Sequence, residues 1–225
     1  PALPAGPAPV VLSAAPAPIT GAPMTAPSAP PARPVPLWNI ANILTMVRMV
    51  MVPVLVVLAV IHPDSVGGRI LVTVVFLLAM LTDLADGHLA RSRGLITDFG
   101  KIMDPIADKA MTGAALIMLS VWDYVPWWMT VLILVREFGI TIMRFTILKY
   151  GALPANWAGK AKTVVQTIAI TFCLMPFELW WEPARWIGLA LVLLAVVLTV
   201  WSGLVNLKDG LRLRREALAA PDARP

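Results

Sequence analysis

Long runs of hydrophobic residues alternate with short polar connections along the chain after residue 36. Each run can cross the hydrocarbon core of a bilayer, about 30 Å, at the helical rise of about 1.5 Å per residue. The runs lack the period of two that marks barrel strands, so the pattern predicts an all-α integral membrane protein with a bundle of six transmembrane helices. The predicted spans are 43–61, 70–91, 100–122, 126–148, 157–177 and 186–206.

The two ends of the chain differ from this pattern. Residues 1–36 contain twelve prolines and a single charge, Arg33, so they predict a disordered Pro/Ala-rich tail. The tail has no basic start followed by a continuous apolar core, so we do not expect it to act as a signal peptide. Residues 37–42 predict a short N-terminal interfacial helix on the cytoplasmic face. The catalytic domain is then expected at 37–207, and residues 208–225 are expected to form a basic cytoplasmic C-terminal tail.

Charge gives the expected orientation. The chain is 59% hydrophobic and 14% charged, which excludes an ordinary soluble domain, and its net charge is +5. Basic residues gather in the second and fourth connections and after the last span, whereas tryptophans gather near the other connections. The positive-inside rule therefore predicts that both termini and these basic connections are cytoplasmic. This distribution indicates contact with anionic lipid headgroups and no role for nucleic acid.

Four carboxylates near the ends of the second and third predicted spans are the candidate chemistry. Asp83 and Asp86 fall within a stripe of about 100° on one helix, and Asp104 and Asp108 within about 80° on the next. Four facing carboxylates would repel one another unless divalent cations neutralised them. Hard oxygen ligands favour Mg²⁺ or Mn²⁺, so we expect two such ions, an arrangement suited to phosphoryl transfer.

These aspartates belong to a pattern of eight fixed residues across 26 positions. It resembles, with no element missing, the signature of the CDP-alcohol phosphotransferase family: Asp83-x2-Asp86-Gly87-x2-Ala90-Arg91-x8-Gly100-x3-Asp104-x3-Asp108. The resemblance implies a six-helix bundle, usually a homodimer, with a polar cavity open to the cytoplasm.

The resemblance also implies roles for individual residues. The first three aspartates would be metal ligands, and Asp108 would join the metal cluster or act as the catalytic base. Four further residues would surround the cytidine nucleotide, with the guanidinium of Arg91 pairing with its phosphates: Gly87, Ala90, Arg91 and Gly100.

Basic residues on the later spans are candidates for binding the acceptor alcohol. Arg136 and Arg144 lie about 80° apart on the fourth span, and Lys160 lies near the start of the fifth. They would suit an anionic acceptor. An equally open interpretation is that they extend to the membrane surface, or that Arg136 pairs with Glu137. For Lys149 and Lys162 the sequence favours this ordinary surface role.

A narrower resemblance concerns the acceptor. Residues 39–45 with Arg48, 135–137 followed by Arg144, and 157–163 with Gln166 are similar to segments of bacterial phosphatidylglycerophosphate synthases, from about residue 38 to 206. The chain departs from them at Ala41, often a proline there, and in its tail. This resemblance implies transfer of the phosphatidyl group of CDP-diacylglycerol to glycerol 3-phosphate in the bacterial plasma membrane, releasing CMP.

Two alternatives remain open at this point. The same chemistry could use another acceptor, either inositol phosphate or, as in cardiolipin synthesis, phosphatidylglycerol. A membrane transporter or metal channel is a different class of function, because intramembrane carboxylates also line ion pathways. The aspartates gather at one end of two spans rather than along a route, and this favours the enzyme.

Overall fold

The protein is described by a computed structural model covering residues 39–93, 97–147 and 157–219; the side chains of residues 86–93 lie outside that description. The tail at 1–36 and Lys149 also lie outside it. Within these ranges all regular structure is helical, as the sequence predicts. The elements are α1 (Ile40–Ile61), α2 (Val66–Arg93), α3 (Asp98–Val121), α4 (Trp127–Ile147), α5 (Trp157–Leu174), the 3-10 turn η2 (Phe177–Leu179) and α6 (Ala184–Ala219).

Each predicted span corresponds to one helix, but two ends differ from prediction. Asn39 caps α1, accepting a hydrogen bond from the backbone N–H of Asn42 at 3.0 Å, so 40–42 form the first turn of α1. The expectation of a separate interfacial helix there was therefore wrong. At the other end, α6 continues 13 residues beyond 206. Its last turns contain good helix formers and an i,i+4 pair between Arg212 and Glu216, 2.7 Å apart.

Among the described residues, three helical segments are long and apolar enough to cross a membrane: Asn42–Ile61, Val66–Ala85 and Ala184–Glu216. The other three long helices, α3, α4 and α5, carry most of the charged candidate residues, which lowers their mean hydropathy. Crossing of the bilayer by these three helices stays a prediction.

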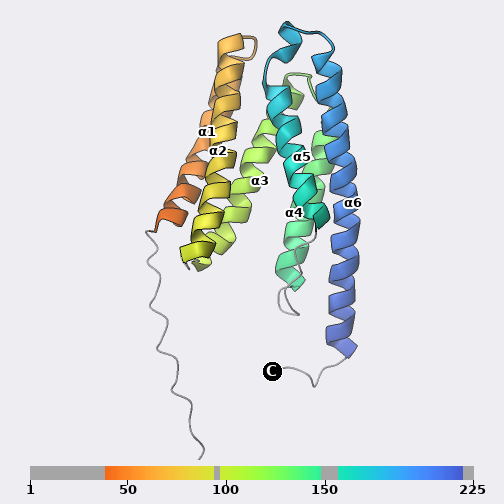
Figure 1. Ribbon diagram of the computed structural model, residues 1–225. Helices are drawn as coiled ribbons and strands as arrows, with labels where there is room; N and C mark the ends of the chain where they lie inside the picture. Colours follow the sequence, from red (N-terminus) through yellow and green to blue (C-terminus); the bar gives the residue numbers. More distant parts are fainter. Residues whose placement is uncertain (1–38, 94–96, 148–156, 220–225) are drawn as a thin grey trace, which may run out of the picture. The chain divides into compact units, whose positions relative to one another are not determined.

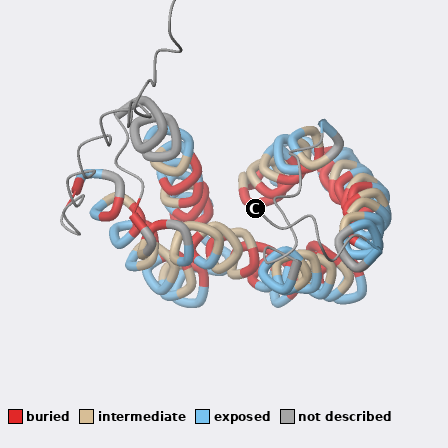
Figure 2. Tube along the Cα trace, turned by 90° about the horizontal axis from the view of Figure 1, so that it is seen from below, coloured by how far each residue is buried: buried red, intermediate tan, exposed pale blue. Residues whose placement is uncertain are grey.

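The helices follow one another around the bundle in the order α2, α1, α3, α4, α6 and α5, and α5 also contacts α2 and α3 (Figure 1). Buried positions lie where the helices meet, and exposed positions lie on their outer sides (Figure 2). Fully buried apolar side chains from four helices fill the middle of the bundle, among them Phe76, Leu116, Ile133 and Ile170. This apolar core separates the two ends of the bundle.

Arg69 joins α2 to the end of α5, at the end of the bundle opposite the aspartates. It belongs to the first turn of α2, where the hydroxyl of Ser65 accepts a hydrogen bond from the N–H of Gly68 at 3.3 Å. Its guanidinium donates to three backbone carbonyls at the end of α5, those of Cys173 (2.9 Å), Leu174 (3.3 Å) and Met175 (3.4 Å). These carbonyls have no partner within the helix, so Arg69 acts as a C-cap supplied by another helix.

Other groups enclose the same guanidinium. It forms an ion pair with Glu178 and lies 5.5 Å from the ring centre of Trp122 and 5.6 Å from that of Tyr124. Arg69 is 8% exposed and therefore largely shielded from water. The predicted second span, 70–91, begins one residue after Arg69, whereas α2 begins at Val66, so the hydrophobic pattern did not indicate that Arg69 lies inside the bundle.

We expect Arg69→Gln to lower the free energy of unfolding by about 3 kcal/mol, since it leaves the partly buried Glu178 carboxylate, 18% exposed, without its counter-charge. Thermal unfolding of the purified protein in detergent measures this loss. Arg185→Gln is the matched control, because Arg185 is exposed and donates to a single carbonyl, that of Asp123. Equal melting temperatures for the two variants would contradict the assigned role of Arg69.

Candidate functional site

Two of the predicted aspartates are held by side chains from α1. The hydroxyl of Thr45 donates to Oδ1 of Asp104 at 2.5 Å, and Nη1 of Arg48 lies 2.5 Å from Oδ1 of Asp83. Arg48 is fully buried, whereas the side chain of Asp83 is 37% exposed. Because Thr45 and Arg48 lie about one turn apart on α1, this helix fixes one carboxylate from α2 and one from α3.

The start of α3 is fixed in the same way. Thr97 caps the helix by accepting from the N–H of Gly100 at 3.1 Å, and its hydroxyl also donates to Oδ1 of Asn42 at 2.9 Å. A Cβ on Gly100 would lie 3.1 Å from Oδ1 of Asn42 and 3.6 Å from Oδ2 of Asp104. Glycine at this position therefore lets α1 approach α3 closely beside an aspartate.

Carboxylate oxygens are the ligands that Mg²⁺ and Mn²⁺ prefer, so the donor type of Asp83, Asp104 and Asp108 fits either ion. Among the side chains that the structure describes, no three potential metal ligands form one group. Four of the predicted residues lie in α2 with their side chains outside the description: Asp86, Gly87, Ala90 and Arg91. Their predicted roles stay predictions.

Asp108 lines a polar pocket of about 470 Å³ between α3, α4, α5 and α6. The pocket brings Asp108 together with the three predicted acceptor residues, Arg136, Arg144 and Lys160. Arg144 and Lys160 are exposed, and Arg144 donates to Oδ1 of Asn206 at 3.5 Å. Residues more than 90 positions apart in the chain thus line one cavity that contains both a carboxylate and several cations.

Glu137 lies at the centre of a cluster of charged side chains in this pocket. Its Oε1 accepts hydrogen bonds from Lys162 and, at 3.0 Å, from Nη1 of Arg136, while Nζ of Lys109 lies 3.6 Å from its Oε2. All four side chains are at most 14% exposed. The expected pairing of Arg136 with Glu137 is confirmed, and Arg136 also lines the pocket.

The surface role assigned to Lys162 was wrong. Lys162 is 7% exposed and its ammonium pairs with Glu137 of α4, so the side chain points into the bundle. Sequence analysis named Glu137 only as a partner of Arg136, not as a residue of the site, and it did not single out Lys109. A carboxylate inside a predicted span needs a counter-charge, so Glu137 itself was the available signal.

A glycine on α6 makes room for the guanidinium of Arg136. Nη2 of Arg136 donates to the hydroxyl of Ser202 at 2.5 Å. A Cβ on Gly203 would lie 2.9 Å from Nε of Arg136. Arg136 therefore extends from α4 across the surface of α6, and both helices determine its position.

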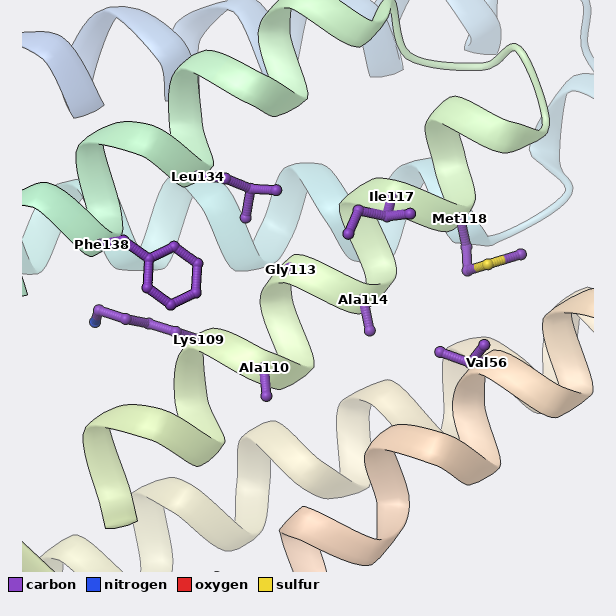
Figure 3. A pocket seen from close by; sticks show the side chains of 9 residues that line it. All are labelled: Val56, Lys109, Ala110, Gly113, Ala114, Ile117, Met118, Leu134 and Phe138. Carbon is purple, nitrogen blue, oxygen red and sulfur yellow. The ribbon is translucent and has the colours of Figure 1, made fainter. Parts of the chain in front are cut away.

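A second pocket, about 300 Å³ and apolar, lies along α3 (Figure 3). Small residues of α3, including Gly113 and Ala114, form its floor, and Val56 of α1 and Leu134 of α4 lie on its sides. Lys109 lines both pockets and extends beside Phe138 at one end of the apolar one (Figure 3). Its side chain thus marks the boundary between an apolar and a polar cavity.

Comparison with known proteins identifies the family of this chain. The family model described as CDP-alcohol phosphatidyltransferase matches residues 38–201. A Mycobacterium tuberculosis protein named "Probable phosphatidylglycerophosphate synthase" is 42% identical over 176 residues, which cover 77% of this chain and 82% of that protein. The CDP-diacylglycerol--glycerol-3-phosphate 3-phosphatidyltransferase of Bacillus subtilis is 34% identical, covering 73% and 93%, and that of Salmonella choleraesuis is 33% identical, covering 73% and 91%. The chain therefore belongs to the CDP-alcohol phosphatidyltransferase family.

Proposed function

We propose that this protein transfers the phosphatidyl group of CDP-diacylglycerol to glycerol 3-phosphate, forming phosphatidylglycerol phosphate and CMP. One observation carries the proposal: a single polar pocket contains Asp108, a candidate base, and cations from three helices, as transfer to the hydroxyl of a phosphate-bearing acceptor requires. The names of the relatives support the same reaction.

The proposed reaction depends on Mg²⁺ or Mn²⁺, with two ions held by Asp83, Asp86, Asp104 and Asp108. When bound, such ions neutralise the charge that develops on the phosphoryl oxygens. Thr45 and Arg48 support this assignment, because they restrict the carboxylates of Asp104 and Asp83 to fixed positions. Gly87, Ala90, Arg91 and Gly100 are proposed to bind the cytidine nucleotide.

In the proposed mechanism, Asp108 removes the proton from the terminal hydroxyl of glycerol 3-phosphate. The resulting oxygen attacks the phosphorus that carries diacylglycerol. A new P–O bond forms, the P–O bond to CMP breaks, and CMP leaves with the electron pair. The described residues of the pocket include no serine, cysteine or histidine next to a base, which favours direct displacement over a covalent intermediate.

The acceptor phosphate is proposed to bind to Arg136, Arg144 and Lys160. The pocket supports this because it contains five cationic side chains and two carboxylates, Asp108 and Glu137, among its lining residues. An uncharged acceptor would give Arg144 and Lys160 no phosphate to bind, whereas Arg136 already has Glu137 as an anionic partner. The phosphate of inositol phosphate could bind to the same cations. Comparing CMP release with the two acceptors distinguishes them.

We propose that the pocket and both termini face the cytoplasm of a bacterium, with the protein in the plasma membrane. The basic end of α6 lies at the same end of the bundle as the C-terminal end of α4 and the start of α5 (Figure 1). These two helix ends carry cations of the pocket, as the positive-inside rule requires. Exposed tryptophans at the opposite end, such as Trp128, Trp180 and Trp186, suit the outer interface.

A transporter of metal ions fits these features less well. An ion pathway needs polar residues along its length, whereas fully buried apolar side chains occupy the middle of the described bundle. A catalytic pocket open to one side needs no such continuity.

The first prediction concerns the reaction itself. Purified protein with CDP-diacylglycerol and Mg²⁺ should release CMP when glycerol 3-phosphate is added, and chelation of the metal should stop the release. Asp104→Asn should lower the rate by about 100-fold or more, since it removes one proposed metal ligand. Release of CMP is measured with inositol phosphate and phosphatidylglycerol in parallel. Selective turnover of either one would keep the chemistry and reject the proposed acceptor.

The second prediction concerns the exposed cations of the pocket. Arg144→Gln and Lys160→Gln should each raise the KM for glycerol 3-phosphate about fivefold, because each removes one partly exposed charge contact with the acceptor phosphate. The KM for CDP-diacylglycerol should stay unchanged. Lys208→Gln on α6 is the control, since Lys208 is exposed and outside the pocket. Unchanged kinetics in both variants would mean that these cations do not bind the acceptor.

We further propose that the protein is a homodimer, as the family resemblance implies. Native mass spectrometry of the protein released from detergent should give twice the mass of the 24.3 kDa chain. A monomer that retains full activity would reject this proposal.

A further inference from the structure

The buried cations of the polar pocket are arranged around one carboxylate, that of Glu137. Lys109 comes from α3, Arg136 from α4 and Lys162 from α5, and each forms an ion pair with Glu137. Within the pocket they contrast with Arg144 and Lys160, which are exposed. The pocket thus has an inner set of cations held by Glu137 and an outer pair open to the cavity.

The inner cations keep hydrogen-bonding capacity beyond their contacts with Glu137. A guanidinium has five N–H donors, and Arg136 directs one nitrogen to Glu137 and another to Ser202. An ammonium has three donors, and the hydrogen bond of Lys162 to Glu137 occupies one of them. Both residues line the pocket, so donors remain for an anion inside it.

Burial explains why the carboxylate is needed. Charged groups taken out of water are unstable without a nearby opposite charge, and Lys162 and Arg136 are both largely buried. Without Glu137, the ammonium of Lys162 would either lose its proton or turn away toward water. In both cases the inner part of the pocket would lose a correctly placed cation.

We propose that Glu137 is a positioning residue for the anionic acceptor: it holds Arg136 and Lys162 in place so that they bind the acceptor phosphate, and it does not contact the acceptor itself. This inference rests on the proposed function, because it takes the polar pocket as the acceptor site. It also assigns acceptor binding to Lys162, alongside Arg136, and leaves Arg144 and Lys160 as the outer contacts. Lys109 links the carboxylate to the helix that carries Asp108.

The test compares Glu137→Gln with the wild-type protein. Glutamine keeps the shape of the side chain and removes its charge, so Arg136 and Lys162 should lose their fixed positions. The KM for glycerol 3-phosphate should rise about tenfold, the size expected for one lost charge-assisted hydrogen bond, while the KM for CDP-diacylglycerol stays within about twofold. Glu137→Asp, which keeps the charge, should recover part of the affinity. Glu216→Gln, which removes an exposed carboxylate of α6, should match the wild type.

Three outcomes would reject the role of Glu137. An unchanged or lower KM for glycerol 3-phosphate would mean that the carboxylate merely opposes the anion. Equal increases in both KM values, or a loss confined to kcat, would indicate a general structural effect. If Glu137→Gln does not fold, Glu137→Asp must still raise the KM for glycerol 3-phosphate selectively, though by less.

Failure of the proposed function would be visible separately, because the wild-type protein would then release no CMP with glycerol 3-phosphate. In that case calorimetric titration with glycerol 3-phosphate, in the absence of CDP-diacylglycerol, decides the positioning role. Weaker binding to Glu137→Gln than to the wild type supports it, and equal binding or none to either protein rejects it.

Discussion

The organisation of this bundle depends on one requirement: a charge buried between helices must have an opposite charge or several hydrogen-bond partners beside it. Glu137 meets this requirement with cations from three helices. Arg48 meets it by pairing with Asp83. The Arg48–Asp83 pair joins α1 to α2, and the pairs of Glu137 with Lys109 and Lys162 join α4 to α3 and to α5, so contacts that neutralise charge also position these helices. The polar pocket is a result of this arrangement, since its lining consists largely of groups that must face one another.

The candidate site has two halves, the aspartates and the acceptor cations, and different helices hold each half in place. Asp83 and Asp104 are positioned by α1, through Arg48 and Thr45. The cations are positioned by a carboxylate of α4 and, for Arg136, by the surface of α6 at Ser202. Asp108 lies on α3 between these halves and lines the cationic pocket. Such a division suits a reaction of two substrates, because the aspartates and the acceptor cations are supported by separate sets of contacts.

The sequence predicted the helices well, and it placed the candidate aspartates on helix faces, because both inferences depend on local information. Hydrophobic length identifies a span, and the spacing of Asp104 and Asp108 puts them on one helix face. Glu137 and Lys162 are 25 residues apart and lie on different helices, so the periodicity of a single helix gives no information about their contact. For the same reason the sequence did not predict that Arg69 caps α5, because Arg69 and Cys173 are more than 100 residues apart in the chain. Extension of α6 to Ala219 was missed because hydrophobicity marks where a span ends, while the helix itself continues in charged residues.

The cap that Arg69 forms on α5 also bears on the permeability of the membrane. A bundle containing several buried charges risks providing a path for protons or ions. Here Arg69 ties α2 to the end of α5 at one end of the bundle, and fully buried side chains such as Phe76 and Ile170 lie between that end and the cationic pocket. Water that enters the pocket therefore meets a hydrocarbon barrier inside the protein. With such a barrier, the proposed headgroup reaction would proceed within the bundle without opening a path for ions across the membrane.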